Sequence, residues 1–435
     1  MTPMIIAGLC STACLRTIVE EAVTPWLFIQ TDSRTDVEAT AAAMDRMVRV
    51  AEETDAAMVY SDYFSHDAVC CLNDCLEGSV RDDFDFGPLV MVRADALKEI
   101  VECMPDYNHA AWYAARLSLS TVGPIVHVPE PLYSVGNVAE CGGQFDYVNP
   151  RNREVQLEME QAFTAYLRQT GAWIAPRHEE IDFTGDYPVE ASVVIPVKNR
   201  VSTVGDAVRS ALAQETDFDY NVIVVDNHST DGTTELLREM ASQSPRLIHM
   251  VPESMTLGIG GCWNEALCSK YCGRFAVQLD SDDLYSSSSV LSAIVDCFRR
   301  NHCGMVVGSY KLTDFNLETI PPGVIDHREW TDDNGPNNLL RINGMGAPRA
   351  FFTGIARNLH FPNVSYGEDY AMALRITRSY PVKRIYDVLY LCRRWEGNSD
   401  ASLTREKANR FNYYKDTLRS WELSARRQLN RCLDD

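Results

Sequence analysis

From residue 191 onward, the chain alternates between short apolar runs and segments with helical periodicity. The runs at 191–197, 221–226 and 275–280 are almost continuously apolar, which is typical of strands buried on both faces. Apolar residues recur at helical spacing over 204–212 and 290–298. This strand and helix alternation predicts an α/β domain built on a doubly wound sheet.

Other patterns divide the rest of the chain. Residues 151–170 carry apolar positions four apart and end before a glycine, which predicts a helix. The stretch that follows has two prolines and no clear period, as in a linker. We expect an N-terminal domain over 1–150, a helix and linker over 151–189, a main domain over 190–400, and a helical tail over 401–435.

Composition narrows the class of protein. The 435 residues include 40 Lys and Arg against 61 Asp and Glu, a formal charge of −21. Such an acidic chain is a poor binder of nucleic-acid backbone. We expect no membrane span and no secretory signal, because no apolar run reaches spanning length and no basic residue precedes the apolar N-terminal run. The 14 cysteines include no Cys-x-x-Cys pair, which predicts reduced thiols in a cytoplasmic protein. Peripheral attachment to the inner face of a membrane stays open.

Polar side chains follow three of the predicted strands, at 198–200, 226–228 and 280–283. Ligands of doubly wound sheets bind outside the carboxyl ends of the strands. A single acid there is as often a turn former as a site residue, but three such ends predict a site. The carboxylates within 280–283 repel one another unless a cation compensates them. Mg²⁺ or Mn²⁺ together with a diphosphate is the simplest partner.

These residues belong to an ordered set of motifs. The set comprises ASVVIPVKNR, NVIVVDNHSTDGTTE, GIGGCWNEAL, GRFAVQLDSDD, GEDYAMALR and LYLCRRWEGNSDAS. In this order and spacing, residues 191–400 resemble glycosyltransferase family 2, the inverting enzymes of the GT-A fold. The resemblance implies an α/β fold with a Rossmann-like, doubly wound mixed sheet.

The resemblance also implies a donor site. Asp226 would read the nucleotide base, Asp280 would contact ribose or share the metal, and Asp282 would hold Mn²⁺ or Mg²⁺. Asp283 is an additional candidate for the site or, equally, a cap for the next helix. The implied nucleotide-sugar contacts are Pro196, Asn199, Arg200, Asp226, Asn264, Asp280, Arg394 and Trp395.

The family's catalytic base matches Asp369, which would take the proton from an acceptor hydroxyl. Its neighbour Glu368 is the alternative base, and both acids are also plausible as caps of the helix that follows. Processive members carry Gln-x-x-Arg-Trp, but Leu391 occupies the Gln position here. We therefore expect a transferase that makes single additions.

The first 150 residues repeat parts of the main domain. LFIQTDSRTD at 27–36 aligns with 275–284, and AAMVYSDY at 56–63 aligns with 304–311. The segment from His109 to Asn137 aligns with the segment that starts at Gly367. Shared order predicts a second, truncated GT-A-like domain before the main one.

This repeat lacks the expected chemistry. Arg34 stands where Asp282 binds the metal, and residues 109–112 contain no acid. The two nucleotide-binding strands that should precede residue 25 are missing. We expect a catalytically inactive domain with one of two roles, binding of the acceptor or structural support, and we favour structural support because degenerate copies lose sites more readily than they gain them.

The predicted function is metal-dependent, inverting transfer of a sugar from a nucleotide-sugar, with UDP as the expected nucleotide, to a hydroxyl acceptor in glycan or polysaccharide biosynthesis. The acceptor can be a glycan, a lipid-linked glycan or a protein, and homo-oligomerisation stays open. Two alternatives are an inactive glycan- or partner-binding scaffold and a nucleotidyltransferase. The latter is disfavoured because PVKNRVSTVGD carries a single glycine where a phosphate loop is expected.

Overall fold

The computed structural model describes residues 4–5, 9–32, 35–66, 68–136, 153–176, 179–398 and 403–434. The chain forms two compact units. The first unit comprises Met1–Trp173, Leu340–Ile342 and Thr404–Asp435, and the second comprises Ile174–Leu339 and Asn343–Leu403. The helices expected over 151–170 and 401–435 are present as α5 (Arg153–Gln169) and α13 (Arg405–Asp434), and both belong to the first unit.

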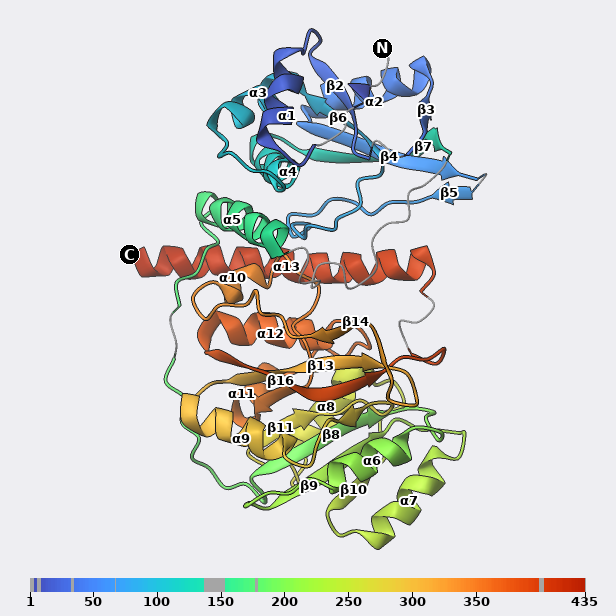
Figure 1. Ribbon diagram of the computed structural model, residues 1–435, viewed down its shortest axis with the longest axis vertical. Helices are drawn as coiled ribbons and strands as arrows, with labels where there is room; N and C mark the ends of the chain where they lie inside the picture. Colours follow the sequence, from blue (N-terminus) through green and yellow to red (C-terminus); the bar gives the residue numbers. More distant parts are fainter. Residues whose placement is uncertain are drawn as a thin grey trace. The chain divides into compact units, whose positions relative to one another are not determined.

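The second unit contains one mixed sheet (Figure 1). Its strand order is β10-β9-β8-β11-β15-β13-β16-β12, with β14 paired to β13. The strands are β8 (Ala191–Val197), β9 (Tyr220–Asp226), β10 (Leu247–Met250), β11 (Phe275–Gln278), β12 (Leu284–Tyr285), β13 (Met305–Thr313), β14 (Thr319–Ile325), β15 (Arg349–Phe352) and β16 (Val382–Arg393). The helices are α6 (Val204–Leu212), α7 (Thr233–Gln243), α8 (Ile259–Cys268), α9 (Val290–Asn301), α10 (Gly335–Asn338), α11 (Thr353–Leu359) and α12 (Glu368–Ser379).

The expected α/β class with a mixed sheet is confirmed. Strands β8 to β11 pair in parallel, whereas β15 runs antiparallel to both β11 and β13. Every residue of β9 is buried, because the sheet is covered on both faces at this inner strand. The apolar stripe predicted on α9 is also buried against this sheet.

The first unit also contains one mixed sheet, in the order β1-β2-β6-β4-β7-β3 with β5 paired to β4 (Figure 1). Its strands are β1 (Met4–Ile5), β2 (Trp26–Gln30), β3 (Val37–Ala39), β4 (Met58–Ser65), β5 (Ala68–Cys70), β6 (Leu89–Arg93) and β7 (Ile125–Val135). Besides α5 and α13, its helices are α1 (Thr12–Glu20), α2 (Ala41–Thr54), α3 (Ala94–Cys103) and α4 (Ala111–Val122).

The two sheets share one topology. The order β1-β2-β6-β4-β7-β3 corresponds strand by strand to β8-β11-β15-β13-β16-β12, and every neighbouring pair has the same sense in both. The attached strands β5 and β14 correspond as well. Among the described residues, β9 and β10 have no counterpart in the first sheet, where a two-residue strand stands in the place of β8.

Register refines the sequence comparison. Tyr63 pairs with Tyr133 on β7, and Tyr310 pairs with Tyr390 on β16. Strand pairing therefore matches Tyr63 with Tyr310, one residue away from the match with Lys311 that the sequence comparison predicts. No helix among the described residues is both long enough and apolar enough to cross a lipid bilayer.

Candidate active site

The carboxyl end of β11 carries the acids of the predicted metal motif. Asp280 donates its backbone N–H to the hydroxyl of Tyr390 at 2.9 Å, and its Oδ1 accepts from Gln278 Nε2 at 2.9 Å. Burial raises the pKa of the Asp280 carboxyl, the Arg349 guanidinium opposes this effect, and the nearby Asp282 carboxylate adds to it. Asp280 and Asp282 thus lie close enough for their charges to interact.

Asp282 is tied to the segment that follows β16. Its Oδ2 accepts hydrogen bonds from Trp395 Nε1 at 3.2 Å and Asn398 Nδ2 at 3.1 Å. Arg393 Nε donates to the Asp282 carbonyl at 2.5 Å. The predicted metal ligand and the predicted Arg-Trp segment therefore meet in one cluster.

Asp283 has a different surrounding. Its side chain is almost fully buried, and its Oδ1 accepts from the backbone N–H of Arg393 at 2.8 Å. Burial, followed by the charges of Asp280 and Asp282, raises its pKa well above the usual range. Asp283 therefore joins the β11 turn to β16, rather than capping a helix.

The acids predicted as catalytic form the first turn of α12. Gly367, just before the helix, has φ +81°, a conformation that favours glycine. Glu368 is 9% exposed, and among the described residues no hydrogen-bond partner reaches its Oε2. Burial and the adjacent Asp369 raise the Glu368 pKa to about 8. The Asp369 side chain, in contrast, is 30% exposed.

Arg349, at the start of β15, joins these two clusters. Its Nη1 lies 3.0 Å from Asp369 Oδ2. Burial disfavours the charged form of Arg349, but the carboxylates of Asp369, Asp280 and Glu368 outweigh it and raise its pKa. Sequence reasoning missed Arg349, although a cation within the apolar run RAFF is a signal that could have found it.

The GIGGCWN motif positions α12 through its backbone. A Cβ on Gly260 would lie 1.9 Å from the carbonyl oxygen of Pro362, and the Gly260 N–H donates to the Val364 carbonyl at 2.9 Å. The amide of Asn264 exchanges two hydrogen bonds with the backbone of Phe361, both at 2.9 Å. These contacts fix the segment that leads into α12, and they engage both the N–H and the carbonyl side of the Asn264 amide.

Asp226 ends β9 and is fully buried. Its carboxylate accepts from Ser229 N at 3.0 Å and Thr234 Oγ1 at 2.5 Å, and lies 3.4 Å from His249 Nε2. Burial opposes ionisation, but the hydrogen bonds from Ser229, Thr234 and His249 outweigh it and lower the Asp226 pKa. The adjacent Asn227 Oδ1 is buried and has no hydrogen-bond partner among the described residues.

The residues at the end of β8 contact both the loop after β9 and the segment around Trp395. Pro196 is half-buried, and Asn199 adopts φ +54° and accepts from Thr230 N–H at 2.8 Å. Arg200 Nη2 donates to the Gly397 carbonyl at 3.1 Å, and its guanidinium lies 6.0 Å from the centre of the Trp395 ring. Residues 395–398 thus link the first strand end to Asp282.

Arg394 is half-buried, and its backbone N–H donates to the carbonyl of Thr313 at 2.7 Å. The structure therefore brings Arg200, Trp395 and Asp282 together, and separately joins Asp280, Glu368 and Asp369 through Arg349.

The carboxylates of Asp280 and Asp282 fit a hard divalent cation if a substrate supplies the other oxygen ligands. Within the described part of the chain, no group of three or more His, Cys, Asp or Glu side chains is arranged to hold a metal ion. Mg²⁺ commonly binds through one or two carboxylates together with phosphate oxygens. Asp280 and Asp282 supply two carboxylates, so the diphosphate would supply the remaining ligands.

The corresponding positions of the first unit differ. Asp32 follows β2 as Asp280 follows β11, and Gln30 donates to the Asp32 carbonyl at 2.7 Å. The first turn of α4 contains Ala111 and Trp112, and no acid. Arg34, predicted in the place of the metal ligand, lies outside the described residues.

Comparison with known proteins agrees with this geometry. Residues 192–351 match the family model for glycosyl transferase family 2. The chain is 27% identical to the chondroitin synthase of Escherichia coli over 251 residues, which cover 55% of this chain and 35% of that protein. It is 31% identical to the putative teichuronic acid biosynthesis glycosyltransferase TuaG of Bacillus subtilis over 121 residues, 28% of this chain and 46% of that protein.

A solved structure, Staphylococcus aureus TarS 1–349 in complex with UDP-GlcNAc, is similar over 49% of this chain and 61% of that one, with 20% identity and a TM-score of 0.42. The chain spans 26–46% of the length of the curated relatives that it matches. Asp369 and Trp395 lie beyond the matched range. The family match and the strand-end acids together lead to one conclusion: residues 192–351 belong to a glycosyl transferase family 2 domain.

Proposed function

We propose that the second unit transfers a sugar from a nucleotide-sugar, with UDP as the nucleotide, to a hydroxyl of a growing glycan, with inversion at the anomeric carbon. The observation that carries the proposal is the Arg349 bridge. Its guanidinium lies 3.0 Å from Asp369 Oδ2 and is close enough to Asp280 for their charges to interact. The proposed donor site and the proposed general base would thereby share one location, in a unit that matches the family 2 model.

In this proposal the donor lies across the ends of β8, β9 and β11. Asp282 and Asp280 would hold Mn²⁺ or Mg²⁺, which supplies positive charge to the departing diphosphate. Arg200 and Arg394 would contact the diphosphate, and guanidinium groups suit that role because they bind phosphate oxygens in a bidentate manner. Trp395 packs beside both Arg200 and Asp282.

The base of the nucleotide would lie near Pro196, Asn199 and Asp226. Because the Asp226 oxygens already accept bonds from three side-chain or backbone donors, base reading by Asp226 requires one of these bonds to be given up. Asn227 Oδ1, buried and unpartnered among the described residues, is a second acceptor for a base N–H. Asn264 acts through the backbone of Phe361, by holding the segment that leads into α12.

Asp369 is the proposed general base. Its side chain is more exposed than that of Glu368, so an acceptor hydroxyl reaches it more readily. Arg349 would orient the Asp369 carboxylate through their 3.0 Å contact. Glu368 is the alternative base, since a carboxyl with a pKa near the working pH transfers protons efficiently.

The acceptor class follows from chemistry and from the relatives. A carboxylate base suits a hydroxyl nucleophile. One similar protein is a chondroitin synthase, and another is named for teichuronic acid biosynthesis. We therefore propose a polysaccharide or related glycan as acceptor.

The direct test measures release of UDP from a panel of UDP-sugars by the full chain, with Mn²⁺ and with EDTA. Asp282→Asn should lower the rate by about 10³-fold, because it removes the charge that would anchor the cation. The matched control is Asp296→Asn, an exposed acid on α9, which should leave the rate unchanged. No turnover of any sugar-nucleotide would favour a binding scaffold, and release of pyrophosphate from a nucleoside triphosphate and a sugar phosphate would favour a nucleotidyltransferase.

A further inference from the structure

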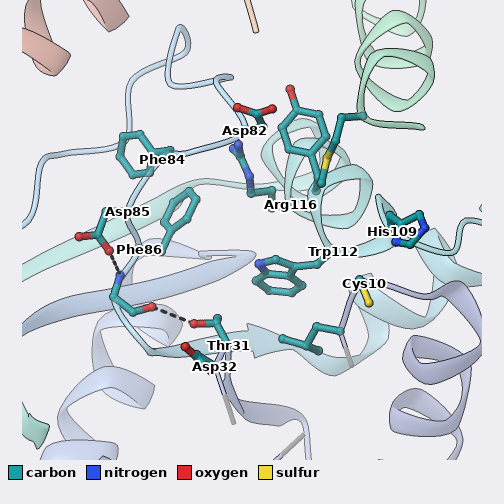
Figure 2. A pocket seen from close by; sticks show the side chains of 14 residues that line it. Cys10, Thr31, Asp32, Asp82, Phe84, Asp85, Phe86, His109, Trp112 and Arg116 are labelled. Atoms are coloured by element: carbon teal, nitrogen blue, oxygen red, sulfur yellow. Dashed lines mark hydrogen bonds between the residues drawn. The ribbon is translucent and has the colours of Figure 1, made fainter. Parts of the chain in front are cut away.

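The first unit contains a cavity of about 490 Å³. Its volume is within the range of roughly 300–1,000 Å³ that is usual for small-molecule sites. Figure 2 shows Trp112 projecting among the other lining side chains, with Phe84, Phe86 and Arg116 on one side and Thr31 and Asp32 below it. The cavity is therefore lined by aromatic rings together with polar groups.

The cavity lies at the position in the first sheet that the active site occupies in the second. Thr31 and Asp32 follow β2, the counterpart of β11. Gly87 precedes β6, the counterpart of β15, and Trp112 is in the first turn of α4, the counterpart of α12. A ligand in this cavity would thus lie outside the carboxyl end of β2, where open α/β sheets bind their ligands.

Anion-binding groups at this cavity are already engaged. The N–H groups of Asn108, His109 and Ala110 at the start of α4 all donate to the carboxylate of Glu158 on α5, at distances between 2.7 and 3.2 Å. Burial opposes ionisation of Glu158, but these three hydrogen bonds outweigh it and lower its pKa. The helix start therefore carries its own permanent anion and offers little to a phosphate.

The arginines are engaged as well. Arg116 donates to the carbonyls of Ser79 and Arg81 and lies 5.4 Å from the centre of the Phe86 ring. Arg341 forms an ion pair with Asp82. Because both of these guanidinium groups already have acceptors, neither Arg116 nor Arg341 is an unpaired cation available to a diphosphate.

What the cavity offers is aromatic surface beside carboxylate acceptors. Trp112 is half-buried, and the Asp85 side chain is 57% exposed. Asp85 Oδ1 accepts from Gly87 N–H at 2.8 Å, and its Oδ2 lies 3.5 Å from Arg405 Nη1, so the Asp85 carboxylate is held in place at the cavity. Aromatic rings bind the apolar C–H faces of sugars, whereas carboxylates accept hydrogen bonds from sugar hydroxyls and protein hydroxyls both accept and donate them.

We propose that this cavity binds a neutral mono- or disaccharide, of the kind that serves as acceptor in glycan synthesis. The assignment to an acceptor rests on the proposed transferase function, whereas saccharide binding itself does not. The first unit is then a carbohydrate-binding domain that keeps the transferase topology and has exchanged catalytic acids for an aromatic ring. This proposal takes up acceptor binding, the other of the two roles that the sequence left for this domain.

The test uses saturation-transfer NMR and calorimetric titration on the full chain without any donor. The probes are cellobiose, lactose, maltose and N,N′-diacetylchitobiose at millimolar concentration, with uridine and UDP as further arms. At least one disaccharide should bind, and Trp112→Ala should weaken that binding by about tenfold or more. UDP binding should not change in Trp112→Ala, because the proposed donor site belongs to the other unit.

Three further variants separate loss of the cavity's function from general loss of folding or of transferase activity. Trp421→Ala removes an exposed tryptophan of α13 in the same unit and should leave saccharide binding unchanged. Asp85→Asn keeps the oxygen that accepts from Gly87 but removes the charge, and it should weaken binding in a chain that remains folded. Saccharide binding should persist in Asp282→Asn, so the cavity is tested even in a chain without transferase activity.

The proposal is overturned by any of three results. These are the absence of Trp112-dependent binding for all four disaccharides, equal loss of binding in the Trp421 control, and Trp112-dependent binding of uridine or UDP in place of the sugars. A phosphate-bearing ligand would also place Arg116, rather than Trp112, at the centre of recognition.

Discussion

The first turn of α4 and the first turn of α12 occupy the same place in two sheets of the same topology. In α12 that turn carries Glu368 and Asp369, which face an arginine. In α4 it carries Ala111 and Trp112, and the carboxylate comes from Glu158 on another helix. An acid at a helix start is favourable in both cases. In α12, however, the acids belong to the helix itself, and Asp369 contacts Arg349 on β15.

A second difference lies where the segment before each helix packs. In the first unit, Thr12 on α1 donates its hydroxyl to the Pro105 carbonyl at 2.8 Å. In the second unit, Gly260 on α8 brings its bare backbone against the Pro362 carbonyl. The glycine allows a closer approach of the two segments, whereas the threonine fills the gap with a side chain and a hydrogen bond. Retention of a topology therefore does not require retention of the contacts that position the helix carrying the proposed base.

The largest effect on the transfer rate should come from removing an acid from the first turn of α12, since the first turn of α4 has none. Asp369→Asn preserves the shape of the side chain but removes the proton acceptor, and we expect a loss of about 10²–10⁴-fold in transfer rate. Donor binding, measured by calorimetry with UDP, should be retained. Glu368→Gln is the paired variant, and it should lose less. Near-normal turnover by Asp369→Asn with an inactive Glu368→Gln would exchange the two roles.

The second test uses the burial of Glu368. Its pKa rises from 4.5 to about 8 on folding, so the folded state binds more protons between these values. Stability attributable to this group is present below about pH 4.5 and is lost as the pH rises toward 8. Glu368→Gln should therefore raise the melting temperature more at pH 8 than at pH 5. Each kcal/mol of added unfolding free energy corresponds to a rise of about 2–4 °C.

Glu265→Gln, at an exposed position on α8, is the control for this pH series and should give the same small change at both values. No counterpart of this pH dependence is expected at α4, where Ala111 takes the corresponding place. Equal stabilisation by Glu368→Gln at both pH values would show that Glu368 ionises normally in the folded chain.

The smallest effect concerns the glycine contact. Gly260→Ala places a Cβ against the Pro362 carbonyl and should cost about 1–3 kcal/mol, through displacement of the segment before α12. Gly205→Ala on α6 is the matched control, since its Cβ would meet only the mobile end of Arg209 at 3.3 Å. That control should be neutral or slightly stabilising. Urea unfolding of both variants decides the matter, and equal midpoints would argue against a close backbone contact.

Much of this arrangement follows from local pattern. The strands β8, β9 and β11 were predictable because continuous apolar runs mark strands buried on both faces. The polar residues that follow these strands were predicted as a site for a different reason, because ligands of doubly wound sheets bind outside the carboxyl ends of the strands. The contacts of Arg349 with Asp369 and of Glu158 with His109 join residues far apart in the sequence, so no local pattern predicts them. The contact of Asp226 with His249 likewise joins residues 23 apart in the sequence.

The repeat shows the same limit. Shared order of short motifs indicated a second copy, but the one-residue difference at Tyr63 emerges only from strand pairing. The sequence also indicated that residues 109–112 contain no acid, and the first turn of α4 contains none. The cavity of the first unit was not predictable, because Phe84, Trp112 and Asp32 come together only through the sheet.

The hydrogen bonds from Trp395 and Asn398 to Asp282 Oδ2 have a thermodynamic consequence. A carboxylate oxygen has few lone pairs, so a cation that coordinates this oxygen competes with both N–H donors. Cation binding and attachment of residues 395–398 are then negatively linked, and each weakens the other by the same free energy.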